Sequence, residues 1–305
     1  MTIKEANNVR AIIVSDIHLR DTQPVCRLDD FIETQIKQLQ WLSELKADIC
    51  VKSHRNSSDV PILCGGDIFD KWKASPFLMG VAIDYLPFMT TTIGNHDLPA
   101  HNFNLFHKSG AGVLLKAEQI DMSINGLIDV GDFRVLTVPF GMEGEVKDHH
   151  RDKADVVLVH DLVETEAEAK AWARKFPKAE LIVIGDNHTS ACYPFKDLPR
   201  VLVPGSFNVQ TADQIGNPHS AWLWRKDGLP IPVEVPEDKT DMTREHLVDK
   251  EEMDDRMEEF VSSFITRLET GKDIGLDFKS NLTAFIKENK VSKTVEKVIW
   301  EVVNG

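Results

Sequence analysis

The sequence predicts an α/β fold in which two stacked sheets are covered by helices. Short apolar runs alternate with helical patterns in the first half of the chain. The second half adds further apolar runs, two of them close enough to form a hairpin, and five of the runs stop abruptly at polar residues. Alternating strands and helices are typical of a parallel sheet, and the surplus of strands favours a second sheet.

The first half of the chain contains three predicted strands and two predicted helices. The apolar run at residues 11–14 has no polar break, which is typical of a strand buried on both faces. Apolar side chains recur at helical spacing within residues 28–45 and again within residues 77–85. The other two strands are predicted at residues 60–64 and 90–93.

The second half is richer in predicted strands. Residues 127–130 and 133–137 are expected to pair as an antiparallel hairpin through Gly131 and Asp132. The remaining strands, the first two of which flank a predicted helix around Trp172, are expected at residues 156–159, 181–184, 201–203 and 221–224.

The composition changes near residue 235. Three prolines punctuate the extended stretch 228–236, and two apolar stripes at helical spacing follow within residues 253–268 and 291–302. We therefore expect one large domain over residues 1–235 and a helical region over residues 236–305. The two stripes either fold back onto their own domain or form a helical pair that binds a partner, and the sequence leaves both alternatives open.

The charge balance argues against a free-standing nucleic-acid binder. The 305 residues include 35 basic and 49 acidic side chains, a net charge of −14, whereas affinity for phosphate comes mainly from Lys and Arg. Metal ions or a basic partner subunit would weaken this objection. The chain has no long apolar segment and no C-x-x-C pair among its 4 cysteines, so we expect a cytoplasmic protein with reduced thiols and no membrane contact.

Five predicted strands end in groups that can bind a metal ion. Because the strand ends of one sheet lie side by side, we expect these groups to share one site. Mixed His, carboxylate and amide ligands suit Mn, Fe or Zn better than Ca or Mg alone, and so many ligands call for two ions. In chain order the groups are Asp16 and His18, Asp67 and Asp70, Asn95 with His96 and Asp97, His160, and Asp186 with His188.

The motifs D-x-H, G-D-x-x-D, G-N-H-D, H and G-x-x-H follow one another over residues 15–188, and this order resembles the calcineurin-like metallophosphoesterases. The resemblance implies a four-layer α-β-β-α sandwich with a helical C-terminal appendage. Residues 66–70, 97–99 and 203–206 are similar to the SbcD-type DNA repair nucleases within that superfamily, as is Arg27 with Asp30 and Phe31.

The resemblance also implies a role for each residue of the motifs. One metal would be held by Asp16, His18, Asp67 and His188, and the other by Asp67, Asn95, His160 and residue 186. The family usually has His where this chain has Asp186, and this harder, anionic ligand favours Mn or Mg.

The other motif residues are expected to support the reaction. His96 would protonate the leaving oxygen, with Asp97 orienting its ring. Asp70 would hold His18 or a water molecule. Asp97 as a plain turn residue and Asp70 as a helix N-cap remain alternatives.

The function that this resemblance implies is that of a metal-dependent DNA phosphodiesterase in repair, recombination or replication. It would act with two divalent ions, Mn or else Mg or another transition metal, as a 3′ to 5′ exonuclease and single-strand endonuclease. An SbcC-type SMC-like coiled-coil ATPase would be its partner and would supply DNA-binding surface, and a homodimer is compatible with this class. The alternatives are a phosphatase or phosphodiesterase for nucleotides or phosphoproteins, and a non-catalytic scaffold.

Two further groups of residues have open roles. Trp72 lies between Lys71 and Lys73, and it either packs in a core or stacks on a base. The histidines outside the motifs are expected to be solvated, with His101 and His107 the closest to the site. They are His54, His101, His107, His149, His150, His219 and His246.

Overall fold

The structure is a computed structural model of the chain. It describes residues 1–123, 126–226, 229–237, 241–245, 247, 278–288, 291, 293, 296, 297, 299 and 300. Contacts divide the chain into two units, residues 1–243 and residues 244–305. Arg27 attaches the end of the first unit through an ion pair of 2.6 Å with Glu237, and Arg27 and Met242 form an isolated β-bridge. The predicted domain boundary at residue 235 stays a prediction.

Two six-stranded sheets form the first unit. In the first sheet, strands β1 to β4 are parallel and β11 pairs antiparallel with β1. Its order is β12 (Ile231–Glu234), β11 (Ser220–Arg225), β1 (Val9–Val14), β2 (Ile62–Cys64), β3 (Met89–Thr91) and β4 (Ile120–Asp121). The second sheet has the order β5 (Leu127–Val130), β6 (Phe133–Val138), β7 (Val156–His160), β8 (Leu181–Gly185), β10 (Arg200–Val203) and β9 (Ala191–Tyr193).

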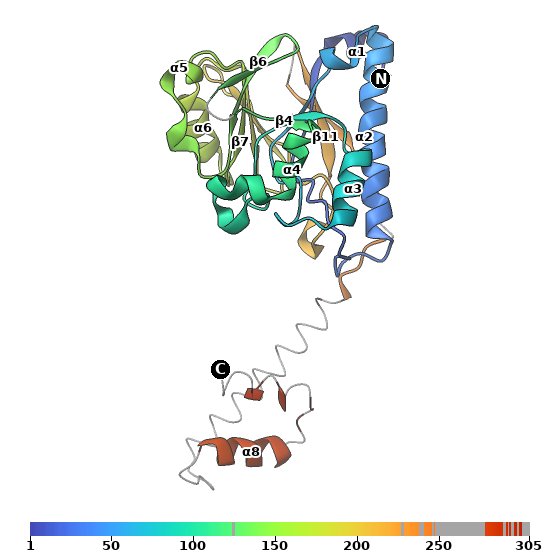
Figure 1. The fold of residues 1–305 in the computed structure, drawn as a ribbon, viewed down its shortest axis with the longest axis vertical. Coiled ribbons are helices and arrows are strands. Elements are labelled where there is room, and N and C mark those ends of the chain that lie inside the picture. Colours follow the sequence, from blue (N-terminus) through green and yellow to red (C-terminus); the bar gives the residue numbers. More distant parts are fainter. Residues whose placement is uncertain are drawn as a thin grey trace. The chain divides into compact units, whose positions relative to one another are not determined.

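Helices cover the outer face of each sheet. Figure 1 shows α2 and α3 beside the first sheet and α5 and α6 beside the second, which gives four layers. The helices of this unit are α1 (Ile3–Asn8), α2 (Phe31–Ser53), α3 (Pro76–Tyr85), α4 (Gly110–Lys116), α5 (Asp148–Arg151) and α6 (Glu166–Lys175). Short 3-10 turns are η1 (Ser57–Asp59), η2 (Pro99–His101), η3 (Phe103–Lys108), η4 (Glu143–Glu145) and η5 (Ala212–Gln214). The predicted four-layer sandwich is confirmed.

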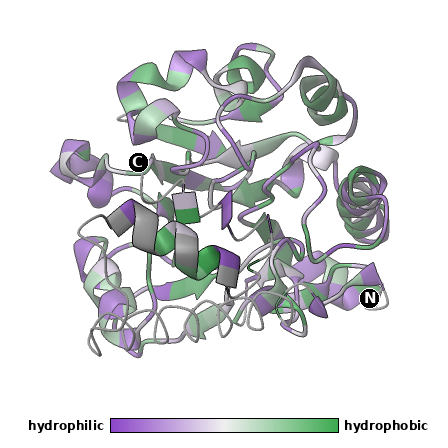
Figure 2. Cartoon of the chain, turned by 90° about the horizontal axis from the view of Figure 1, so that it is seen from below, coloured by the Kyte–Doolittle hydropathy of each residue, from purple (hydrophilic) through white to green (hydrophobic). Residues whose placement is uncertain are grey.

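Strand β1 is buried on both faces, as its continuous apolar run predicted. Successive side chains of a strand point to opposite faces of the sheet. Ile12 and Val14 therefore pack in the core under α2 and α3, whereas Ala11 and Ile13 pack in the core between the two sheets. In Figure 2 the strands carry much of the hydrophobic colour, and the surrounding helices carry both colours.

The predicted hairpin and helices also appear in the structure. Strands β5 and β6 pair antiparallel, with Val130 opposite Phe133 across the turn. Asp30 caps α2 by accepting a hydrogen bond from the Glu33 backbone, and Ser75 caps α3. Asp70 is therefore not the N-cap of α3. The short elements β4, β9, α1 and α4 were not predicted, because so few residues show no clear period.

The second unit is described only in part. Helix α8 (Phe278–Glu288) buries Leu282, Phe285 and Ile286, and Ile299 belongs to the same small core. The predicted stripe at 253–268 lies outside the described residues, as does most of the stripe at 291–302. In the described part of the chain, no helix is both long enough and apolar enough to cross a bilayer. All 4 cysteines are free thiols.

Candidate metal centre

The polar groups that follow five strands meet at one place, but these strands belong to both sheets. Strands β1, β2 and β3 come from the first sheet, and β7 and β8 come from the second. The expectation that a single sheet supplies the site is therefore wrong. The carboxyl ends of the two parallel sets meet because the sheets pack face to face: the Asp186 backbone N–H donates to Asp16 Oδ1 at 3.1 Å.

Asp67 lies at the centre of this group. Its Oδ2 is 3.3 Å from His160 Nε2 and 3.7 Å from His18 Nε2, and its Oδ1 accepts a hydrogen bond of 3.0 Å from the His96 backbone. The side chain of Asp67 is 1% exposed. One carboxylate thus lies between histidines that come from different sheets, which is the position expected of a ligand shared by two ions.

The backbone at the site adopts positive φ angles, which residues other than glycine rarely adopt. Asp16, His18, Asp67 and Asp186 have φ values of 52°, 47°, 54° and 91°. Hydrogen bonds between loops hold this arrangement: the Asp16 N–H donates to Gly66 O and the His18 N–H to Asp67 O, both at 3.0 Å. Such strain persists where surrounding structure fixes it, and it clusters at functional sites.

Among the residues that the structure describes, three sets of side chains have ligand atoms within 4.8 Å of one another. They are Asp16 with His18 and His188, Asp16 with Asp67 and His160, and His18 with Asp70 and His96. Asn95 Oδ1 lies 3.1 Å from His160 Nε2, and Asp186 Oδ1 lies 3.7 Å from the same atom. The structure thus gathers all seven predicted metal ligands, and which ion each would hold stays a prediction.

The loop after β10 supports two of these residues. The Ser206 N–H donates to His188 O at 3.1 Å, and the Phe207 N–H donates to Asp16 O at 3.2 Å. Ser206, the last residue of the stretch 203–206 noted in the sequence for its family resemblance, thus helps to fix the backbone of His188, and the next residue, Phe207, does the same for Asp16.

Burial and neighbouring charges shift the pKa values of the central groups. Burial, with the nearby Asp67 carboxylate, raises the pKa of Asp16 to about 7. Burial alone would also raise the pKa of Asp67, but the His160 and His18 rings outweigh it and hold that pKa below its usual range. Two carboxylates without a counter-ion are costly in such a site, and divalent cations would remove that cost.

The histidines divide into neutral and protonated rings. Burial, reinforced by His188, lowers the pKa of His18 to about 3. Burial likewise lowers the pKa of His188. Burial opposes protonation of His160 too, but Asp67 outweighs it and raises the pKa of His160 well above its usual value. His18 and His188 are therefore neutral at pH 7, the form that binds a metal, and metal binding at His160 would release a proton.

The donor set fits divalent cations. His18 Nε2 and His188 Nε2 face each other at 3.2 Å, and His18 Nδ1 is buried without a hydrogen-bond partner. Buried polar atoms normally have partners. Converging imidazole nitrogens, carboxylates and one amide oxygen are a common ligand set of Mn, Fe and Zn sites.

A family model named calcineurin-like phosphoesterase matches residues 9–202, which is most of the first unit. The chain belongs to this family. It is thus a metal-dependent phosphoester hydrolase, and the sheets and the metal centre described above lie within or beside the matched segment.

Comparison with solved structures gives distant matches to this phosphoesterase. One is described as a novel archaeal phosphodiesterase, with 10% identity and a TM-score of 0.39, over 73% of this chain and 99% of that one. Another is a metallophosphoesterase from Sphaerobacter thermophilus, with 14% identity and a TM-score of 0.36, over 90% and 98%. No curated protein sequence matches significantly. TM-scores this low carry no argument about substrate.

The predicted role of Asp97 in this phosphoesterase is wrong. Its carboxylate is fully buried and accepts hydrogen bonds from the backbones of Ile68 at 3.2 Å, Phe69 at 3.1 Å and Gly94 at 3.3 Å. These bonds connect the loops after β2 and β3. The His96 ring is held instead by the Asp70 carbonyl, which lies 2.7 Å from Nδ1. Asp97 therefore supports the loops and does not orient the His96 ring.

Asp70 lies beside the centre, where it was expected. Its carboxylate is within 4.8 Å of ligand atoms of His18 and His96, and it pairs with Arg20 at 3.5 Å. It makes no hydrogen bond with His18 Nδ1, which has no partner in the structure. The support that Asp70 gives thus comes from its backbone carbonyl, which holds His96.

The pH dependence of stability tests the position of Asp97. Burial and the Asp67 charge raise its pKa to about 7 from 3.8. A raised carboxyl pKa stabilises the fold below the unfolded pKa, and this contribution is lost as the pH rises through the folded value. Between pH 5 and pH 8 in EDTA, wild type should therefore lose roughly 1–3 kcal/mol more unfolding free energy than Asp97→Asn. The measurement is urea denaturation of both proteins at each pH. A difference in unfolding free energy that is the same at every pH would contradict this.

Gln214 is a contributor to the site that the sequence did not reveal. Its Oε1 accepts hydrogen bonds from the backbones of Gln210 and Thr211 at 2.8 Å and 3.2 Å, and its Nε2 lies 2.7 Å from His188 Nδ1. The T-x-x-Q pattern of residues 211–214 could have predicted the turn, since a capping box is observed there. Nothing in the sequence shows that this turn meets His188.

Removal of Gln214 should weaken metal binding. A ring nitrogen that faces the metal is normally oriented by a partner on the other nitrogen, and loss of that partner typically costs about 10–100-fold in affinity. We expect Gln214→Ala to raise the Kd for Mn²⁺ by that factor, measured by calorimetry. The control is Gln119→Ala, which removes a glutamine whose amide donates to Leu86 O away from the cluster. Unchanged Mn²⁺ affinity in Gln214→Ala would contradict the role.

Gly94 has no room for a side chain. A Cβ there would overlap Asp67 Oδ1 and press against the His160 ring. Because small displacements of catalytic groups can cost about 100-fold in rate, we expect Gly94→Ala to lower the kcat for phosphoester hydrolysis by that factor or more. Gly80→Ala on α3, where a Cβ meets no atom within 4 Å, is the control and should retain full activity. Equal activity of both variants would show that Asp67 does not need its observed place.

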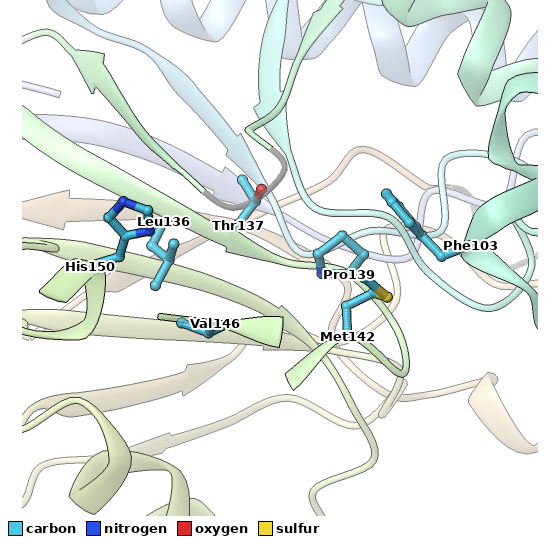
Figure 3. Close-up of a pocket in the computed structure, with 7 residues that line it drawn as sticks. All are labelled: Phe103, Leu136, Thr137, Pro139, Met142, Val146 and His150. Atoms are coloured by element: carbon cyan, nitrogen blue, oxygen red, sulfur yellow. The ribbon is translucent and has the colours of Figure 1, made fainter. Parts of the chain in front are cut away.

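The histidines outside the motifs have mixed surroundings. His101 Nδ1 lies 3.1 Å from Asn95 O, beside the centre. His219 is 4% exposed, and its Nδ1 lies 2.8 Å from Ser206 O, so its predicted solvation is wrong. His150 lines the small pocket of Figure 3, together with Leu136, Val146 and Met142. That pocket has a volume of about 10 Å³, which is room for one water molecule and not for a substrate.

Proposed function

We propose that this phosphoesterase hydrolyses the phosphodiester bonds of DNA, as an SbcD-type nuclease in cytoplasmic repair, recombination or replication. The observation that carries the proposal is the convergence on Asp67 of ligand groups from both sheets, with His96 at their edge. The resemblance of residues 66–70, 97–99 and 203–206 to SbcD-type nucleases supports DNA as the substrate.

The cofactor in this proposal is a pair of Mn²⁺ ions. Divalent ions in such a site lower the pKa of water towards about 7 and neutralise phosphoryl oxygens. Asp67 would be shared between them, Asp16, His18 and His188 would complete one set, and Asn95, His160 and Asp186 the other. The carboxylate of Asp186 favours a hard ion such as Mn²⁺ or Mg²⁺.

His96 would act on the leaving oxygen. Its ring stands edge-on to His18, with the ring centres 4.8 Å apart, and its Nδ1 is fixed against Asp70 O at 2.7 Å. With the Nδ1 proton donated to that carbonyl, Nε2 remains free to give a proton when the ring is cationic. A departing alkoxide needs such a proton, and a positioned acid typically contributes about 10²–10⁴ in rate.

The acidic charge of the chain fits a nuclease that works with a partner. A net charge of −14 gives little affinity for DNA phosphates. We propose that an SbcC-type coiled-coil ATPase binds the region after residue 235 and supplies the basic surface.

Cleavage assays test this proposed function. We expect end-labelled single-stranded and double-stranded DNA to be cut in Mn²⁺, faster with the ATPase partner, and not in EDTA. The proposal fails if the protein hydrolyses bis(4-nitrophenyl) phosphate or a small nucleotide in Mn²⁺ while leaving both DNA forms intact with the partner present. That result would favour a nucleotide phosphodiesterase, and no hydrolysis of any ester would favour a scaffold.

A further inference from the structure

A second pocket lies directly beside the metal centre. Its volume is about 370 Å³, and it lies between the segment after β1 and the segment after β2. Its walls combine three cationic side chains, two hydroxyl groups and several apolar residues. The cations are Arg20, Lys71 and Lys73, the hydroxyls are Thr22 and Ser75, and the apolar side chains include Leu19, Ala74 and Leu78.

Asp70 joins this pocket to the centre. It lines the pocket, and its carboxylate is within 4.8 Å of ligand atoms of His18 and His96. Its carbonyl holds the His96 ring. The pocket therefore begins on the His96 side of the centre, where the leaving oxygen of a substrate would lie.

The acidic groups of the pocket are already engaged, but two of its cations are not. Arg20 donates to Thr22 and pairs with Asp70 at 3.5 Å, and Asp21 accepts a hydrogen bond of 2.5 Å from Ser75 Oγ. Lys71 and Lys73 are exposed, and neither forms an ion pair with a carboxylate of the described residues. Two lysines are thus available to an anion in a pocket that also has an apolar wall.

We propose that this pocket binds the nucleotide on the leaving-group side of the scissile bond, with its phosphate held by Lys71 and Lys73. The inference rests on the proposed function and names a substrate subsite for it. A nucleic-acid strand presents one phosphate per nucleotide, so a phosphate adjacent to the reacting one is present throughout a DNA strand. The sugar or base of that nucleotide would lie against Leu19, Ala74 and Leu78. Trp72 does not line the pocket.

The subsite predicts a preference among small substrates. A dinucleotide with an extra terminal phosphate on the leaving-group side reaches both lysines, whereas an unphosphorylated dinucleotide does not. The probes are the thymidine dinucleotides TpT, pTpT and TpTp, each cleaved in Mn²⁺. We expect one of the two phosphorylated forms to exceed TpT in kcat/KM by about 10-fold, as expected for charge-assisted hydrogen bonds to phosphate.

The variant K71Q/K73Q tests the pocket directly. It should lower that ratio to within about 2-fold of unity, and its Mn²⁺ affinity should equal that of wild type because neither lysine belongs to the predicted ligand sets. It should also reduce the slope of log Kd against log salt for single-stranded DNA by about 1. The matched control is K116Q/K153Q, which removes two exposed lysines outside the pocket and should keep the preference.

The outcomes separate this inference from the proposed function. If wild type cuts DNA but shows no preference for a terminal phosphate, or if K71Q/K73Q keeps the preference, the subsite is wrong and the nuclease stands. If wild type cleaves bis(4-nitrophenyl) phosphate but neither DNA nor any dinucleotide, the proposed function fails and the subsite falls with it.

Discussion

Asp67→Asn is expected to abolish phosphodiester hydrolysis, with kcat reduced by more than about 10³-fold in saturating Mn²⁺. Asp67 is the carboxylate that lies between His160 and His18, at 3.3 Å and 3.7 Å. Asparagine has nearly the same shape but no charge, so it can neither join two cations nor balance the histidines around it. The measurement is steady-state hydrolysis of bis(4-nitrophenyl) phosphate over a range of Mn²⁺ concentrations.

Controls must separate loss of charge from loss of fold. Asp84→Asn removes an exposed carboxylate on α3 and should keep wild-type activity. Because the surrounding histidines hold the pKa of Asp67 below its usual range, its ionised carboxylate stabilises the metal-free fold. Asp67→Asn should therefore be less stable than wild type when both are metal-free, and the activities must be compared under conditions where both proteins are folded. A folded Asp67→Asn protein that retains a tenth of the wild-type activity would contradict a shared ligand at this position.

His96→Ala is expected to lower kcat by about 10²–10⁴-fold while Mn²⁺ binding persists. The His96 ring borders the centre but belongs to neither of the two predicted ligand sets. If the ring protonates the leaving oxygen, its loss should matter most for a poor leaving group. The measurement therefore compares a 4-nitrophenyl ester, whose leaving oxygen needs little protonation, with TpT, whose alkoxide needs a proton.

We expect the loss with TpT to exceed the loss with the nitrophenyl ester by at least about 10-fold. The control is His107→Ala, which removes an exposed histidine on η3 outside the cluster and should not change either rate. Equal losses with both esters would show that His96 binds substrate or metal and does not supply the proton.

The sequence was sufficient to predict the elements that carry the site. The strand β1 was evident because an unbroken β-branched run is typical of a strand buried between two layers, and Asp16 and His18 follow it directly. The motif residues around Asp67 were found in the same way, since each follows the end of an apolar run. These signals can be recognised in the sequence because a buried strand and the polar residues at its end are adjacent in the chain.

Contacts between distant segments could not be predicted. The site joins two sheets because the sheets pack face to face. The sequences of the individual strands do not show which sheet each strand belongs to. Asp97 was misassigned because its neighbour in sequence, His96, faces the site, whereas Asp97 points inward to backbone N–H groups. Gln214 was missed because its contact with His188 depends on a turn that begins after β10 and ends beside another loop.

The number of Mn²⁺ ions bound per chain tests the central claim most directly. Equilibrium dialysis of the EDTA-treated protein against Mn²⁺ should give two ions per wild-type chain and fewer than one per chain of Asp67→Asn, because both proposed ligand sets include that carboxylate. Wild type that binds no more Mn²⁺ than Asp67→Asn at the same free concentration would contradict a metal centre built on Asp67.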